Sequence, residues 1–217
     1  MKDRILFVSD FDNTISLKDF YWVVIEKYFP IEGRQEYVKW KQGAYTDFEF
    51  LSWVFGRLDL SEQALREDIL RIPLDPYFKV FVDDLWQHQG EICIVSAGND
   101  YYINILLQRY QMTAIPVYSN LGLFDKRAIK MQPSSTEVFF SPRYGIDKAK
   151  VVESLKKPET LLCYAGDSDP DFEAGKLATI RFAKGELQPL YRQAGIDFVP
   201  IESYKDIHQY FMKEVWP

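Results

Sequence analysis

The chain of 217 residues is poor in the side chains that bind transition metals or form disulfides, with two cysteines and two histidines. No Cys–His spacing typical of a zinc site occurs. Cys93 and Cys163 each lie in a short apolar run, where a thiol behaves as a small apolar side chain. We therefore expect two buried free thiols.

Long apolar runs are also missing. No stretch approaches the ~18 consecutive apolar residues of a membrane-spanning helix. Only one short apolar run, Ile5–Val8, precedes Asp10, which is too little for a secretory leader. These absences lead us to expect a cytoplasmic protein without a membrane partner.

Positive charge is scarce, with 26 Lys and Arg against 32 Asp and Glu, a net charge of −6 and no basic run. Nucleic acids and anionic membranes attract basic surfaces, so no nucleic-acid partner is expected. A small anionic substrate would need a local positive patch, from a metal and a few lysines. A length of 217 residues is enough for one core with a small second unit, and the hydrophobic content of 47% is ordinary for a globular protein. The oligomeric state stays open.

What the sequence does have is a pair of aspartates, in Asp10-Phe11-Asp12-Asn13-Thr14. The apolar run Ile5–Val8 leads into it, as a buried strand leads into a loop. Asp10 and Asp12 can face one site, because residues two apart on an extended chain point the same way. Two such charges ~4 Å apart repel by about 4 kcal/mol, and Mg²⁺, which prefers carboxylate oxygens, would remove that cost. The alternative is an Asp-rich turn.

Helices and strands follow in a distinct order. Residues 4–9 predict a strand, and residues 16–73 predict helices alone. Strands and helices alternate from residue 74 onward, which predicts an α/β fold with a doubly wound, Rossmann-like parallel sheet. We expect two units, an α/β core of residues 1–15 and 74–217 and an inserted all-helical cap of residues 16–73.

Helix starts are marked within the insertion. Thr46–Glu49 is a capping box, Ser61 is a helix N-cap, and Ser16–Asp19 is similar to a capping box with Asp in the last position. The sequence therefore predicts a helix that begins near Ser16.

Polar side chains follow three of the predicted strands. Asp10 and Asp12 follow the first strand, Ser96 follows a second, and Asp167 and Asp171 follow a later one. Ligands of open α/β sheets bind at the carboxyl ends of the strands, so these side chains are expected in one site. Helix capping is the alternative for both Ser96 and Asp171.

Four segments resemble, in order, the four motifs of the haloacid dehalogenase superfamily: Asp10-x-Asp12-x-Thr14, Ser96 at a strand end, Lys148 at a helix start, and Gly166-Asp167 with Asp171. Asp12 is typical of the phosphatase branch. The position of the helical cap resembles that of the phosphoserine-phosphatase-like members. The run Gly166–Ala174 resembles that of the methionine-salvage enol-phosphate phosphatases.

This resemblance implies a Mg²⁺-dependent phosphatase that acts on a small phosphomonoester. Asp10 would be the nucleophile that forms an aspartyl-phosphate, and Asp12 would protonate the leaving group and later activate water. Ser96 and Lys148 would stabilise the phosphoryl group. The implied metal ligands are Asp10, Asp12, Asp167 and Asp171, and the implied substrate-binding residues are Thr14, Asp19, Ala97 and Gly98. The alternatives are a solvated lysine at Lys148 and a helix-start residue at Asp19.

Two departures argue against phosphoserine as the substrate. Trp53 stands where such relatives carry Arg, and Pro170 stands where phosphoserine phosphatases carry Asn. Aromatic residues crowd residues 20–55, and we expect Phe20, Trp53 and Tyr101 to line an apolar pocket. The methionine-salvage enol-phosphate, phosphoserine, phosphoethanolamine and pyridoxal phosphate all remain open as substrates. A phosphomutase and a non-catalytic binder of a phosphorylated ligand are the other functions considered.

Overall fold

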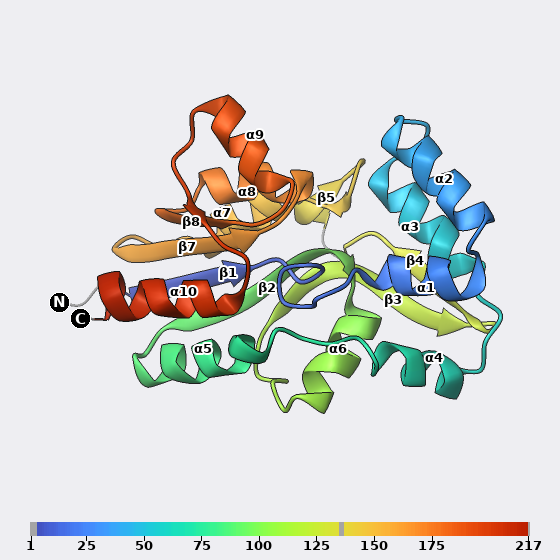
Figure 1. The fold of residues 1–217 in the computed structure, drawn as a ribbon, viewed down its shortest axis with the longest axis horizontal. Coiled ribbons are helices and arrows are strands. Elements are labelled where there is room, and N and C mark those ends of the chain that lie inside the picture. The colour runs from blue at the N-terminus through green and yellow to red at the C-terminus, as the bar shows by residue number, and fades with distance from the viewer. Residues whose placement is uncertain (1–3, 135–136, 217) are drawn as a thin grey trace.

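The computed structural model describes residues 4–134 and 137–216 and shows a sheet covered by helices on both faces (Figure 1). Seven strands lie in the order β4-β3-β2-β1-β7-β8-β9, all parallel except β4, which forms a hairpin with β3. The predicted doubly wound α/β fold is confirmed. The strands of this sheet are β1 (Arg4–Ser9), β2 (Glu91–Asn99), β3 (Val117–Asp125), β4 (Ala128–Gln132), β7 (Thr160–Gly166), β8 (Ile180–Ala183) and β9 (Val199–Pro200), and β5 (Phe140–Ser141) and β6 (Gly145–Ile146) form a separate antiparallel pair.

Strand β1 shows how the sequence produces these layers. Phe7 packs against Phe81 and Phe211 on one face, whereas Leu6 and Val8 belong to a second apolar cluster on the other face. Successive side chains of a strand point to opposite faces, so a strand buried on both faces is a continuous apolar run. One face carries α5 (Pro76–Gln87), α6 (Asp100–Arg109) and α10 (Tyr204–Tyr210), and the other carries α7 (Lys148–Leu155), α8 (Phe172–Lys176) and α9 (Leu187–Ala194) (Figure 1).

Four helices precede α5 and lie at the end of the molecule opposite α10 (Figure 1). They are α1 (Phe20–Tyr28), α2 (Glu32–Lys41), α3 (Asp47–Gly56) and α4 (Glu62–Ile69). Helix α3 contacts β4, and α4 contacts α6, so the insertion holds the β3–β4 end of the sheet on two sides. The ends of the predicted core at residues 1–3 and 217, and residues 135–136, lie outside the described part. In the described ranges no helix is long and apolar enough to cross a membrane.

Most predicted helix starts are confirmed. The side chain of Thr46 accepts from the backbone N–H of Glu49, whose carboxylate accepts from the N–H of Thr46, and Ser61 accepts from the N–H of Ala64. Cys93 and Cys163 are buried free thiols, as expected.

Two local predictions are wrong. The first helix begins at Phe20 without a side-chain cap from Asp19, and the N–H of Phe20 donates instead to Asp12 Oδ1 at 3.2 Å. Ser16 donates to backbone carbonyls before the helix begins. Strand β2 also does not end before Ser96 but continues, through an irregular register, to Asn99.

Asp75 joins two helices and gives a test of the fold. Its buried carboxylate accepts from the N–H of Tyr77 at 2.8 Å and from the N–H of Tyr204 at 2.9 Å. Asp75→Ala removes the acceptor at the start of α5 and of α10, so we expect a loss of about 2–3 kcal/mol in the free energy of unfolding in urea. Asp75→Asn keeps one acceptor oxygen and should lose less.

Asp83→Ala is the matched control on α5. Its carboxylate pairs with Lys79 on an exposed surface, where such a pair contributes under about 1 kcal/mol. Equal losses for Asp75→Ala and Asp83→Ala would contradict this role of Asp75.

Candidate active site

The three central strands carry the predicted site residues to one edge of the sheet. Asp10 directly follows β1, and its N–H donates to the carbonyl of Ala165 in β7 at 2.9 Å. Ser96 lies in β2, and Asp167 follows β7. They open on a cavity of about 750 Å³, whose wall includes Asp10, Asp12, Asp19, Ser96, Ala97, Gly98, Lys148 and Asp167.

Lys148 is the buried positive group of the site. It is the first residue of α7, whose N-cap is Asp147, and only 4% of it is exposed. Its Nζ donates to Asp10 Oδ1 at 2.5 Å and to Asp171 Oδ1 at 2.7 Å. Burial alone would lower the pKa of Lys148, but the two carboxylates raise it above its ordinary value, so the lysine stays charged. The solvated alternative for Lys148 is wrong.

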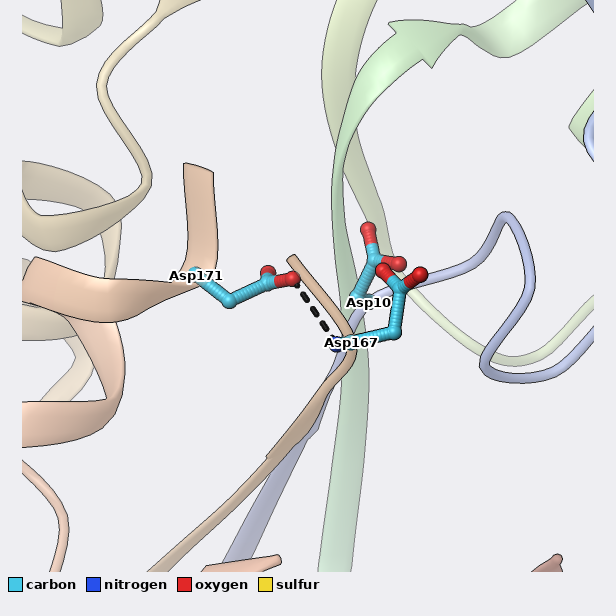
Figure 2. A group of neighbouring side chains, drawn as sticks. All are labelled: Asp10, Asp167 and Asp171. Atoms are coloured by element: carbon cyan, nitrogen blue, oxygen red, sulfur yellow. Dashed lines mark hydrogen bonds between the residues drawn. The ribbon is translucent and has the colours of Figure 1, made fainter. Parts of the chain in front are cut away.

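Asp171 has both of its carboxylate oxygens occupied. Oδ1 accepts from Lys148 and from the hydroxyl of Tyr164 at 2.6 Å. Oδ2 accepts from the N–H of Asp167 at 3.1 Å and of Ser168 at 3.2 Å. Figure 2 shows Asp171 pointing at the backbone of Asp167, while the carboxyl groups of Asp10 and Asp167 lie side by side. Asp171 is therefore arranged to fix its neighbours, and Asp10 and Asp167 face the open space.

Negative charge is concentrated here. Carboxylate oxygens of Asp10, Asp167 and Asp171 lie within 4.8 Å of one another. Burial, and the charges of Asp171 and Asp167, raise the pKa of Asp10 well above its ordinary value against the opposing effect of Lys148. Burial and Asp171 raise the pKa of Asp167 to about 6. Such a set of hard oxygen ligands fits a divalent cation.

Asp12 is held by two donors from different helices. The hydroxyl of Tyr102 on α6 donates to Oδ2, and the N–H of Phe20 on α1 donates to Oδ1. Burial raises the pKa of Asp12, and these two hydrogen bonds act in the opposite direction. A carboxyl group with a raised pKa is suited to donate a proton near neutral pH.

The neighbours of Asp12 differ in their relation to the cavity. Asn13, which the sequence prediction missed as a site residue, adopts a left-handed backbone (φ 55°) and donates through Nδ2 to Asp167 Oδ2 at 2.8 Å. Thr14 is buried outside the cavity wall, and its hydroxyl has no hydrogen-bond partner among the described residues. The structure therefore does not bring Thr14 to the site.

Ser96 faces the cavity and does not cap the next helix. Its Oγ accepts from the N–H of Gly98 at 3.0 Å, and the N-cap of α6 is Asn99. Asp19 lies in the cavity wall, where burial together with the charges of Asp12 and Asp167 raises its pKa to about 7.

The aromatic lining differs from the predicted one. Phe20, Trp53 and Tyr101 are not part of the cavity wall; the aromatic side chains that line it are Tyr21, Trp22, Tyr37, Trp40, Tyr45, Phe55 and Tyr102. Two of them, Tyr21 and Tyr102, directly follow the predicted Phe20 and Tyr101. A run of consecutive aromatics does not fix which of them a helix turns inward, so the sequence pattern carried no signal for this choice.

Arg143 was also missed. It lies in the turn between β5 and β6 and pairs with Asp47 of α3 at 3.0 Å and with Asp169 at 2.8 Å. Lys41, at the end of α2, lies 3.5 Å from Glu186. Both cations line the cavity, in segments where the sequence shows only isolated charges.

The carboxyl ends of the central strands thus group three carboxylates, two of them around a buried lysine. A model of the family described as "Putative Phosphatase" matches residues 5–179, so the chain belongs to this phosphatase family and is a phosphoric monoester hydrolase.

Relatives and solved structures resemble the chain over most of its length. The 2-hydroxy-3-keto-5-methylthiopentenyl-1-phosphate phosphatase of Exiguobacterium sp. is 25% identical over 209 residues, 94% of this chain and 95% of the relative. That of Bacillus cereus is 24% identical and covers 91% of each chain. A HAD family hydrolase from Salmonella enterica has a TM-score of 0.74 at 15% identity, covering 97% of this chain and 72% of that one. A substrate-bound phosphoserine phosphatase has a TM-score of 0.72 at 16% identity, covering 97% and 99%. The two structures show a shared fold.

The raised pKa of Asp19 predicts how the free energy of unfolding depends on pH in metal-free solution. Because its folded pKa of about 7 exceeds the unfolded value, the folded chain keeps a proton that the unfolded chain loses first. The contribution of Asp19 to the free energy of unfolding is therefore present at low pH. It is lost as the pH rises toward neutrality, and the loss amounts to up to about 4 kcal/mol. Asp19→Asn should match the wild type at acidic pH and exceed its free energy of unfolding above neutrality, measured with EDTA.

Asp83→Asn, on an exposed face of α5, is the control and should not show the gain in free energy of unfolding above neutrality that is expected for Asp19→Asn. An Asp19→Asn curve that runs parallel to the wild type would rule out the raised pKa.

Proposed function

We propose that the chain hydrolyses a small phosphomonoester in two steps, through an aspartyl-phosphate on Asp10. The supporting observation is the Asp10 carboxylate at the end of β1, bound by Lys148 at 2.5 Å and grouped with Asp167. A carboxylate can attack phosphorus once the repulsion between the two anions is reduced. Lys148 supplies positive charge at that point.

A magnesium ion fits the remaining charge. Asp10, Asp167 and the backbone carbonyl of Asp12 would hold Mg²⁺, and Asp171 would support it by fixing Asp167 and Lys148. When bound, the ion would neutralise charge on the phosphoryl oxygens.

Each side chain of the site would have a separate role in the reaction. Asp10 attacks phosphorus, and Asp12 gives its proton to the leaving oxygen as the ester bond breaks. The Oγ of Ser96 accepts from the N–H of Gly98, and its hydroxyl would donate its own proton to a phosphoryl oxygen. In the second step Asp12 takes a proton from the water that attacks the aspartyl-phosphate. Lys148 stabilises the charge of the transferring group throughout.

We further propose that residues 16–73 act as a cap on the core formed by residues 1–15 and 74–217. Two ion pairs link the insertion to the rest of the chain across the cavity, Arg143 with Asp47 and Lys41 with Glu186. Closure of such a cap excludes water from the reacting groups.

The cavity favours an ester with an apolar leaving group. Its volume of about 750 Å³ lies in the upper part of the range of small-molecule sites, which is generous for a leaving group as small as serine. Aromatic rings of α1 and α2, including Trp22 and Trp40, form one side. A thioether chain makes favourable contacts with such rings. The enol-phosphate named in the relatives has a methylthio end, and we propose it, ahead of phosphoserine, as the substrate.

Asp10→Asn tests the chemistry. It removes the nucleophile, so phosphate release should fall by roughly 10³-fold or more, and EDTA should abolish wild-type turnover until Mg²⁺ is restored. Asp59→Asn, at an exposed carboxylate paired with Arg127, is the control and should keep full activity. Full turnover of Asp10→Asn would refute the proposed intermediate. Binding of an ester without any wild-type turnover would favour a non-catalytic binder.

The substrate proposal is tested with a panel of phosphoserine, phosphoethanolamine, pyridoxal phosphate and the enol-phosphate. We expect kcat/KM for the enol-phosphate to exceed that for phosphoserine by roughly tenfold or more. Trp22→Ala should reduce this preference, whereas Trp53→Ala, outside the cavity wall, should keep it. A preference for phosphoserine that survives Trp22→Ala would refute the apolar leaving group.

A further inference from the structure

We propose that Tyr102 is the positioning residue that orients Asp12 for proton transfer, and that Gly98 is glycine to make room for the Tyr102 hydroxyl. This inference rests on the proposed function, in which Asp12 is the general acid. Tyr102 itself touches neither the phosphoryl group nor the nucleophile in that proposal. It acts through the carboxyl group of Asp12.

The geometry around Asp12 supports the first part of the inference, that Tyr102 orients the carboxyl group. The hydroxyl of Tyr102 donates to Oδ2, and the N–H of Phe20 donates to Oδ1 at 3.2 Å. Two donors on the two oxygens fix the rotation of the carboxyl plane. A proton donor must be held within hydrogen-bond reach of the atom it protonates, so the orientation of this plane decides whether Asp12 can reach the leaving oxygen.

Tyr102 is itself held rigidly. It is 1% exposed, and its ring packs against three phenylalanines, with centroid distances of 5.9 Å to Phe11, 4.7 Å to Phe20 and 6.4 Å to Phe55. Aromatic pairs at these distances are favourable contacts. The hydroxyl is therefore presented to Asp12 from a fixed direction.

The space around Gly98 supports the second part of the inference, that this residue is glycine to make room for the Tyr102 hydroxyl. A Cβ at this position would lie 1.9 Å from Tyr102 Oη and 3.0 Å from Asp12 Oδ2. Any side chain would push the hydroxyl away from the carboxylate. Gly98 lines the cavity, and its missing side chain keeps the Tyr102–Asp12 hydrogen bond in place.

The chemistry predicts which step depends on Tyr102. As the bond from Asp10 to phosphorus forms and the ester bond breaks, the proton of Asp12 passes to the leaving oxygen, and Tyr102 keeps its own proton. An alkoxide needs that proton to leave, whereas 4-nitrophenolate is stable without it. Losing the orientation of Asp12 should therefore slow an alkyl ester far more than an aryl ester.

The test compares kcat/KM for 2-phenylethyl phosphate and for 4-nitrophenyl phosphate with Mg²⁺ present. This parameter reports steps up to the formation of the aspartyl-phosphate, so the later role of Asp12 does not enter. Tyr102→Phe should lower kcat/KM for the alkyl ester by roughly 10- to 100-fold and change the value for the aryl ester by less than about threefold. Gly98→Ala, which keeps the hydroxyl but displaces it, should give the same pattern.

Two further variants make the result decisive. Asp12→Asn gives the full effect of losing the acid. Tyr101→Phe is the matched control, because the neighbouring hydroxyl bonds to Glu62 outside the cavity, and it should leave both esters unchanged. Equal losses for the two esters in Tyr102→Phe and Gly98→Ala, or no loss in either variant, would overturn the inference while the Asp12→Asn pattern stands. Equal losses in Asp12→Asn would instead overturn the general-acid role of Asp12, and this inference with it.

Discussion

The site depends on burying several carboxyl groups at one edge of a sheet. One lysine compensates only part of their negative charge. In the described ranges Lys148 is the only buried lysine or arginine, and it is shared by Asp10 and Asp171. A buried charge without a partner is costly, so the other carboxyl groups need different compensation. Asp12 and Asp167 receive it from neutral donors, the hydroxyl of Tyr102 and the amide of Asn13 among them.

These compensating groups come from elements far apart in the sequence, which explains why the fold and the site cannot be separated. Lys148 begins α7, the hydroxyl that reaches Asp12 comes from α6, and a backbone N–H comes from the first turn of α1. Asp171 repeats the pattern on the other side, where four donors saturate its oxygens and fix the loop after β7. A bound metal ion would supply the remaining compensation for the carboxylate charge, because the protein's own donors already contact the other sides of these groups.

The sequence predicted the parts of this arrangement that are local. The apolar run before Asp10 indicates a buried strand, and the carboxyl ends of such strands indicate where polar side chains gather. It could not predict choices made by tertiary contacts. Ser16–Asp19 fits a capping box, yet the N–H of Phe20 donates to the carboxylate of Asp12, which lies eight residues earlier in the chain, outside that local pattern. Tyr101 and Tyr102 are equivalent by sequence, and only the rotation of α6 puts Tyr102 on the carboxylate.

The same reasoning explains why the reaction is easier to predict than the substrate. Phosphoryl transfer requires particular functional groups at the ends of particular strands, so residue identity carries the information. In the proposed function the leaving group would contact the rings of α1 and α2 that line the cavity, and which rings these are depends on how each helix is turned. The reacting groups and the aromatic lining are nevertheless coupled. The N–H of Phe20 that binds Asp12 begins the helix that carries Tyr21 and Trp22. In the proposed function, a movement of α1 away from the core would break that hydrogen bond and withdraw these rings together, so a leaving group that held α1 in place would also keep Asp12 oriented.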